Sequence, residues 1–191
     1  QLPQPTQVWS MLATGSSLNA ALCARYFFEQ RFGVLVEIKE PYNFTHYEAV
    51  DPHTDLVVAI SQSGKSASTL AAMRKVQALS LPVFALTSDP QSPIARDCDG
   101  VLDINTGIES VGFVTRGFSA TVLNLLLMAL MIARAQGKAS EAEEQRLFQR
   151  AVLFLHHKHL TALPGVVLDD TDRLTLAAQA ELPLLHLADL D

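Results

Sequence analysis

Short apolar runs alternate with helical periodicities along the first half of the chain. Five runs are almost continuously apolar, which predicts strands that are buried on both faces. They cover residues 8–13, 34–38, 56–60, 83–86 and 101–104. Helical spacing of apolar residues, or a helix-starting Ser-Pro pair, separates several of them, at 18–33, 67–79 and 93–97. Buried strands that alternate with helices predict an α/β fold, a three-layer sandwich of about five parallel strands with right-handed crossovers and helices on both faces.

The pattern changes after residue 104. Residues 115–136 form one long helical pattern that is apolar nearly all round, so we expect this helix to be buried on the sheet and in a homodimer or larger homo-oligomer. Further helices are expected at 140–155 and 169–180, and a last strand at 184–187. We therefore expect a domain over residues 1–137 and a helical extension or connector over 138–191.

Composition restricts the class of protein. Of the 191 residues, 49% are hydrophobic and 18% are charged, which allows one generous domain with a large core. The net charge is −6, and residues 169–191 alone contribute six carboxylates and one arginine. The rest is nearly neutral and holds no basic stripe, so nucleic acid is not an expected partner. The longest apolar run, 122–133, is shorter than the roughly twenty residues of a membrane span, and no membrane partner is expected.

The reactive residue types show no metal or redox pattern. Cys23 and Cys98 lie far apart in the sequence, and we expect both to be buried small residues. No signal segment opens the chain, and this favours a cytoplasmic protein. His156, His157 and His159 do not share one helix face, so no metal site is expected. Both the Walker spacing and the three-glycine dinucleotide fingerprint are absent, so no cofactor is expected.

Two loops rich in serine and glycine each follow a predicted strand and lead into a predicted helix. They are Gly15-Ser16-Ser17 and Ser61-Gln62-Ser63-Gly64-Lys65-Ser66. Serine is a common helix cap, so either loop alone is typical of a plain strand-to-helix connection. Together, at equivalent ends of one sheet, their hydroxyls and the unsatisfied N–H groups of two helix starts predict a phosphate-binding site.

These loops carry a family resemblance. Together with the segments 107–109 and 114–118, they resemble the sugar isomerase (SIS) domain, and most of all the first of the paired domains in glucosamine-6-phosphate synthase and sugar-amine phosphate deglycases. The resemblance implies a flavodoxin-like fold that binds a phosphorylated sugar. It implies that the phosphate contacts Ser61, Ser63 and Ser66, and that Gly15, Ser16, Ser17 and Gln62 lie near the phosphate or the sugar hydroxyls. Lys65 departs from the family, in which an acidic residue is common there, and Ser66 stands where threonine is usual.

The resemblance also implies an activity. The chain is expected to be the N-terminal half of a paired-domain phosphosugar isomerase or deglycase that acts on ketose and aldose 6-phosphates. Its main catalytic groups would come from the second domain and a partner subunit. Glu109 is the candidate catalytic residue within this chain, although it could equally hold its own loop in place. His53 is expected to be exposed, and His46 could reach a neighbouring subunit. Two alternatives remain open: a phosphosugar-sensing regulatory module without catalysis, and a purely structural domain that completes an oligomer.

Overall fold

The computed structural model describes residues 8–106, 115–135, 137, 139–143, 145, 146 and 149. The chain divides into two compact units, residues 1–144 and 145–191, and the fold below is that of the first. Its sheet has five parallel strands in the order β2-β1-β3-β4-β5. The strands are β1 (Val8–Leu12), β2 (Leu35–Lys39), β3 (Thr54–Ile60), β4 (Val83–Thr87) and β5 (Gly100–Asp103). This is the flavodoxin-like strand order, so the expected fold class is confirmed.

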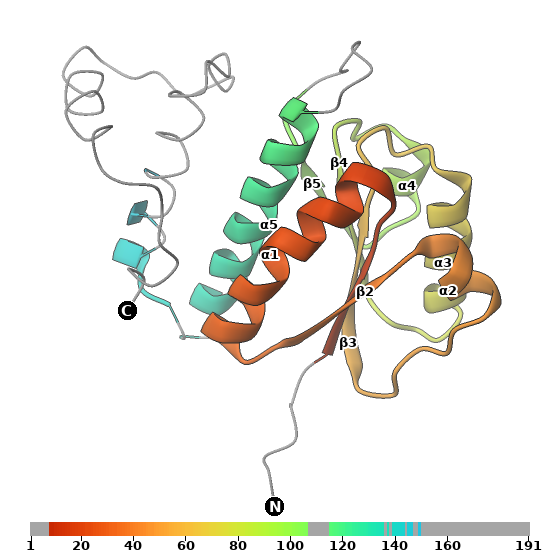
Figure 1. Ribbon diagram of the computed structural model, residues 1–191, viewed down its shortest axis with the longest axis horizontal. Helices are drawn as coiled ribbons and strands as arrows, with labels where there is room; N and C mark the ends of the chain where they lie inside the picture. The colour runs from red at the N-terminus through yellow and green to blue at the C-terminus, as the bar shows by residue number, and fades with distance from the viewer. Residues whose placement is uncertain are drawn as a thin grey trace, which may run out of the picture. The chain divides into compact units, whose positions relative to one another are not determined.

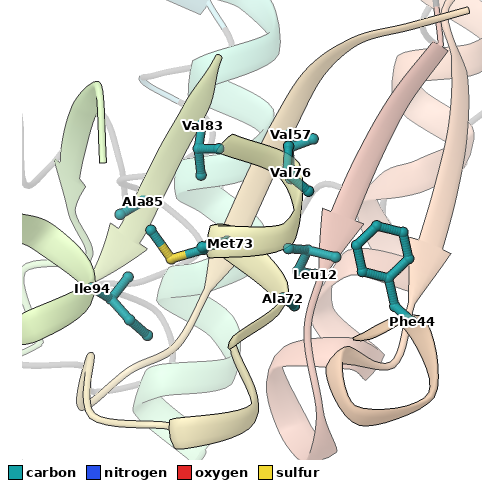
Figure 2. Close-up of a cluster of buried hydrophobic side chains, with 10 residues drawn as sticks. Leu12, Phe44, Val57, Ala72, Met73, Val76, Val83, Ala85 and Ile94 are labelled. Atoms are coloured by element: carbon teal, nitrogen blue, oxygen red, sulfur yellow. The ribbon is translucent and has the colours of Figure 1, made fainter. Parts of the chain in front are cut away.

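Helices cover both faces of the sheet and make a three-layer sandwich. The helices are α1 (Gly15–Phe32), α2 (Pro41–His46), α3 (Ala67–Gln77), α4 (Pro93–Arg96) and α5 (Thr115–Ala135). Figure 1 shows α1 and α5 side by side on one face, with α2, α3 and α4 on the other. The second group has a compact apolar core, in which Leu12 and Val57 of the sheet meet Phe44, Met73 and Ile94 of the helices (Figure 2). Burial of such side chains contributes about 1.5–3 kcal/mol each.

Helix α2 lies between the strands predicted at 34–38 and 56–60, where the sequence pattern predicts no helix. Glu40 caps its start by accepting the N–H of Asn43 at 2.9 Å. Its end is held by the Nζ of Lys75 in α3, which donates to the carbonyl oxygens of Phe44 (2.6 Å), Thr45 (3.3 Å) and Glu48 (2.6 Å). A cation at this end also interacts favourably with the partial negative charge of the helix C-terminus. The short helix therefore depends on a contact with α3 that the local sequence does not reveal.

Helix α1 corrects the expectation for Cys23. The face of α1 that packs inward carries Ala20, Ala24 and Phe28, and the Phe28 ring meets Trp9 edge to face with centroids 5.5 Å apart. Cys23 lies at the border of this face, next to Leu22, and both are exposed. The prediction that it is buried was wrong because none of the described residues covers this border of α1, where Leu22 is also 42% exposed. Cys98 is half-buried, and burial raises the pKa of its thiol.

Helix α5 is buried along one side and more open along the other. Leu125, Ala129 and Ala133 are fully or almost fully buried, whereas Met131 is 54% exposed. By length and composition, Arg116–Ala135 could cross a membrane, although the sequence analysis found no apolar run long enough; the described residues hold one such helix. A core helix passes the same test; α5 contacts α1, and 39% of this apolar stretch is buried. Within the helix predicted at 140–155, residues 141–143, 145, 146 and 149 are helical. Residues 150–155 of that prediction, the helix predicted at 169–180 and the strand predicted at 184–187 lie outside the described residues.

Candidate anion-binding site

The two serine loops follow neighbouring strands. β1 and β3 pair in parallel, with Leu12 opposite Ala59, so Gly15-Ser16-Ser17 and the loop from Ser61 to Ser66 start at adjacent carboxyl ends. The chain leaves β1 toward β2 on one side, while β3 lies on the other. Ligands of open parallel sheets bind beyond the carboxyl ends at such a switch in direction. The structure thus brings the two predicted loops to one edge, at the position expected for a ligand.

The start of α1 has no side-chain cap. Its N-cap residue, Thr14, is extended and its side chain makes no capping hydrogen bond, whereas Glu40, Ser66 and Ser92 cap α2, α3 and α4. The first turn of α1 carries no acidic residue. Its first N–H groups therefore keep their partial positive charge. Gly15 begins the helix with a φ of +59°, and a Cβ added there would meet no atom within 4 Å. An anion has both donors and space at this helix start.

The second loop is a tight turn with its serines at different depths. Ser61 is buried, and its carbonyl oxygen accepts the N–H of Gly64 at 3.0 Å. Ser63 and Lys65 are exposed, and the Ser63 hydroxyl accepts the N–H of Lys65 at 3.4 Å. Lys65 lies 3.8 Å from the Asp89 carboxylate, but both side chains remain open to water. The hydroxyl of Ser63 and the ammonium of Lys65 are therefore free to turn toward a ligand.

Ser66 has a structural task as well. Its hydroxyl oxygen accepts the N–H of Thr69 at 3.4 Å and the hydroxyl of Thr69 at 3.0 Å, and it lies 3.1 Å from the Ser68 hydroxyl. The plain reading of serine as a helix cap is thus correct at this position. The one proton of Ser66 can still be donated, either to Ser68 or to an oxygen of a ligand.

Four residues at the end of β4 and around the start of α4, none of them predicted to belong to the site, lie against this loop. The Gln62 carbonyl oxygen accepts the N–H of Ser88 at 2.9 Å and the hydroxyl of Thr87 at 3.2 Å. The Gly64 carbonyl oxygen accepts the N–H of Ile94 at 3.1 Å. Gly64 itself has a φ of +62°, and a Cβ there would lie 2.0 Å from the Ser92 hydroxyl oxygen. These four residues are Thr87, Ser88, Ser92 and Ile94. The loop rests so closely on the β4–α4 connection that only glycine fits at residue 64.

The other candidate residues do not belong to the two serine loops. His53 is exposed, as expected. His46 is exposed at the end of α2, where its ring lies 4.6 Å from that of Tyr42. Glu109 and the histidines at 156, 157 and 159 lie outside the described residues. Within the described part of the chain, no three His, Cys, Asp or Glu side chains gather in a way that could hold a metal.

The molecule is thus a doubly wound α/β domain in which the starts of α1 and α3 follow adjacent strands of one sheet. The family model of the SIS domain matches residues 10–134. The chain therefore belongs to the SIS domain family. A second family model, glucose-regulated metallo-peptidase M90, matches residues 118–190, which is less than half of the chain.

The match to individual relatives covers only part of each relative's own length. The glutamine–fructose-6-phosphate aminotransferase of Symbiobacterium thermophilum is 36% identical over 139 residues, which are 72% of this chain and 23% of that protein. The C-terminal domain of glucosamine-fructose-6-phosphate aminotransferase from Francisella tularensis has a TM-score of 0.71 at 23% identity, covering 80% of this chain and 44% of that one. A protein of Clostridium difficile 630, described as a candidate phosphosugar isomerase, has a TM-score of 0.67 at 25% identity, covering 81% and 47%. The chain thus spans about a quarter of the curated relative and under half of these structures.

Proposed function

We propose that this chain binds a sugar phosphate at the carboxyl edge between β1 and β3. One observation carries the proposal: the uncapped start of α1 and the serine loop before α3 share this edge in an SIS domain. In this proposal, the phosphate accepts hydrogen bonds from the α1 start and from the hydroxyls of the second loop. The proposed binding residues are Gly15, Ser16, Ser17, Ser61, Gln62, Ser63 and Ser66.

The physical chemistry of the edge supports an anionic ligand over a neutral sugar. Neither α1 nor α3 carries an acidic residue in its first turn, so both dipoles favour negative charge. Lys65 adds a flexible ammonium next to Ser63. Charge-assisted hydrogen bonds contribute about 1.5–3 kcal/mol each, so one hydroxyl accounts for about a tenfold to hundredfold change in affinity.

The relatives suggest the context of this site. Because the matched solved structures are about twice the length of the match, we propose that residues 1–137 act as one SIS domain of a pair and that residues 138–191 connect toward the second. We propose that the pair is an isomerase or sugar-amine phosphate deglycase acting on ketose and aldose 6-phosphates. The names of two relatives, an isomerizing fructose-6-phosphate aminotransferase and a phosphosugar isomerase, support the isomerase part of this proposal. In such an arrangement this chain binds the phosphate of the sugar, and most of the groups that transfer protons lie in the other domain.

Binding is tested by calorimetric titration with fructose 6-phosphate and with fructose. The unmutated protein is expected to bind the phosphorylated sugar much more tightly. Ser63→Ala should weaken binding about tenfold to hundredfold. Ser80→Ala is the matched control, since it removes an exposed hydroxyl beyond the other end of α3. Equal affinity for fructose and fructose 6-phosphate would contradict the proposal.

Catalysis is tested separately, by incubation with several ketose and aldose 6-phosphates in deuterated water. The chain alone is expected to incorporate solvent deuterium at carbons one and two no faster than background, because each missing acid or base group costs about a hundredfold to ten-thousandfold. Rapid exchange that is lost in Glu109→Gln would show that this half is catalytic by itself. Tight binding without exchange in the complete protein would instead favour a phosphosugar-sensing module.

A further inference from the structure

We propose that Thr87 is a positioning residue for the anion site, acting through the peptide unit between Gln62 and Ser63. This inference rests on the proposed function and adds a residue of β4 that does not belong to either serine loop. Thr87 is 0% exposed, so its side chain does not reach a ligand at the edge. Its hydroxyl does reach the backbone of the loop, where it donates to the Gln62 carbonyl oxygen at 3.2 Å.

The direction of that carbonyl determines the direction of a donor. All described peptide bonds are trans, and in a planar trans unit the C=O of one residue and the N–H of the next point in opposite directions. The Gln62 carbonyl points toward β4, where Ser88 N–H and the Thr87 hydroxyl both bind it. β4 lies on the side of β3 away from β1. The N–H of Ser63 therefore points toward β1, the side on which the uncapped start of α1 lies.

The peptide unit between Gly64 and Lys65 is oriented in the same way. The Gly64 carbonyl is held by Ile94 N–H, so the N–H of Lys65 points away from α4. Among the described residues, Ser63 N–H has no acceptor, and Lys65 N–H has only the long bond to the Ser63 hydroxyl. Two backbone donors are thus turned outward because the two carbonyls next to them are turned toward the β4–α4 connection. This is a preorganised arrangement for an anion.

Thr87 suits this task because its hydroxyl is fixed from two sides. The hydroxyl oxygen accepts the N–H of Asp89 at 3.2 Å, and the hydroxyl proton is donated to the Gln62 carbonyl oxygen. The two bonds together fix the direction in which the proton points. The branched side chain also restricts rotation about its first side-chain torsion. Without the hydroxyl, the Gln62 carbonyl would lose the bond from Thr87 and keep the bond from Ser88 N–H, so the peptide unit would be held less firmly toward β4.

The test compares Thr87→Val, which keeps the shape and removes the hydroxyl, with Thr87→Ser, which keeps the hydroxyl. Calorimetry with fructose 6-phosphate should show about tenfold weaker binding by Thr87→Val and nearly unchanged binding by Thr87→Ser. The matched control is Thr121→Val. Thr121 is also buried, and its hydroxyl donates to the Gly117 carbonyl at 2.6 Å, a bond that stays within α5. Urea unfolding of each variant reports the loss of stability alone.

The outcomes are distinguishable. If Thr87→Val and Thr121→Val lose similar stability and both bind as the unmutated protein does, the positioning role is overturned while the binding function stands. If the unmutated protein binds fructose and fructose 6-phosphate equally, the proposed function fails and this inference fails with it. Should Thr87→Val not fold, Thr87→Cys replaces the hydroxyl by a weaker S–H donor and is expected to show intermediate weakening. Unchanged binding by Thr87→Cys would equally overturn the positioning role.

Discussion

Gly64→Ala is the substitution whose cost the structure defines most sharply. An alanine Cβ at residue 64 would lie 2.0 Å from the Ser92 hydroxyl oxygen, 2.3 Å from the Ser92 Cβ and 2.8 Å from the Thr87 hydroxyl oxygen. Non-bonded heavy atoms normally approach to about 3.5–4 Å, so the loop must move away from the β4–α4 connection. Overpacking of this kind costs about 1–3 kcal/mol, and an alanine at positive φ costs about 1–2 kcal/mol more.

The expected loss in the free energy of unfolding is therefore about 2–5 kcal/mol, a large share of the 5–15 kcal/mol typical of a domain. Urea unfolding followed by circular dichroism measures it. Gly15→Ala separates the two contributions, because Gly15 has nearly the same φ of +59° but open space around it. It should lose only the backbone part. All three proteins are compared without sugar phosphate, since Gly15 belongs to the proposed site.

A double substitution tests the collision itself. Ser92→Gly removes both Ser92 atoms that meet the new Cβ, at the cost of a few tenths of a kcal/mol for the cap of α4. In the Ser92→Gly background, Gly64→Ala should cost at least 1 kcal/mol less than it does alone. The reasoning is refuted if Gly64→Ala and Gly15→Ala lose the same stability and Ser92→Gly changes nothing.

Three further outcomes are expected elsewhere in the fold. Lys75→Met should lower the free energy of unfolding by about 2–4 kcal/mol in urea unfolding, because three carbonyls lose a charged donor. Burial lowers the pKa of Lys39. The side chains of Glu48 and Glu37 outweigh this effect, because they accept hydrogen bonds from the ammonium and attract its charge, and they raise the pKa above its usual 10.5. The stabilisation is therefore present at lower pH and lost as pH rises through the folded-state pKa, so Lys39→Met should flatten the fall in stability in strongly alkaline buffer. Finally, sedimentation at micromolar concentration should show an oligomer that Met131→Lys weakens; a monomer before and after the change would contradict the predicted interface on α5.

The fold was readable from the sequence because its strands are continuous apolar runs. β1 is buried at all five positions, and such runs separated by helical spacing admit few arrangements. Helix α2 was missed because its stability comes from Lys75, whose acceptors lie 27–31 residues away in the sequence. Its local signals, Glu40 as a cap and Pro41 at the first turn, were present but cover only six residues.

The site was readable only in part, for a related reason. Glycine and serine at a strand end show up in the sequence, so both loops could be located. The residues that orient the second loop come from the next strand: the hydroxyl of Thr87 reaches Gln62 across 25 positions of sequence. No local pattern marks a buried threonine as a partner of a particular carbonyl. The role of Ser66 was likewise open until the bond from Thr69 N–H showed it to be a cap.

The exposed thiol of Cys23 makes the protein convenient to label. The chain has two cysteines, and the other, Cys98, is half-buried and has a raised pKa, so its reactive thiolate form is scarcer at neutral pH. A maleimide dye should therefore attach first at Cys23 without any substitution. Cys23 follows Ser16 by seven positions along α1, which is about 10 Å at the rise of a helix. A fluorophore there would sit near enough to report occupation of the α1 start, yet outside it.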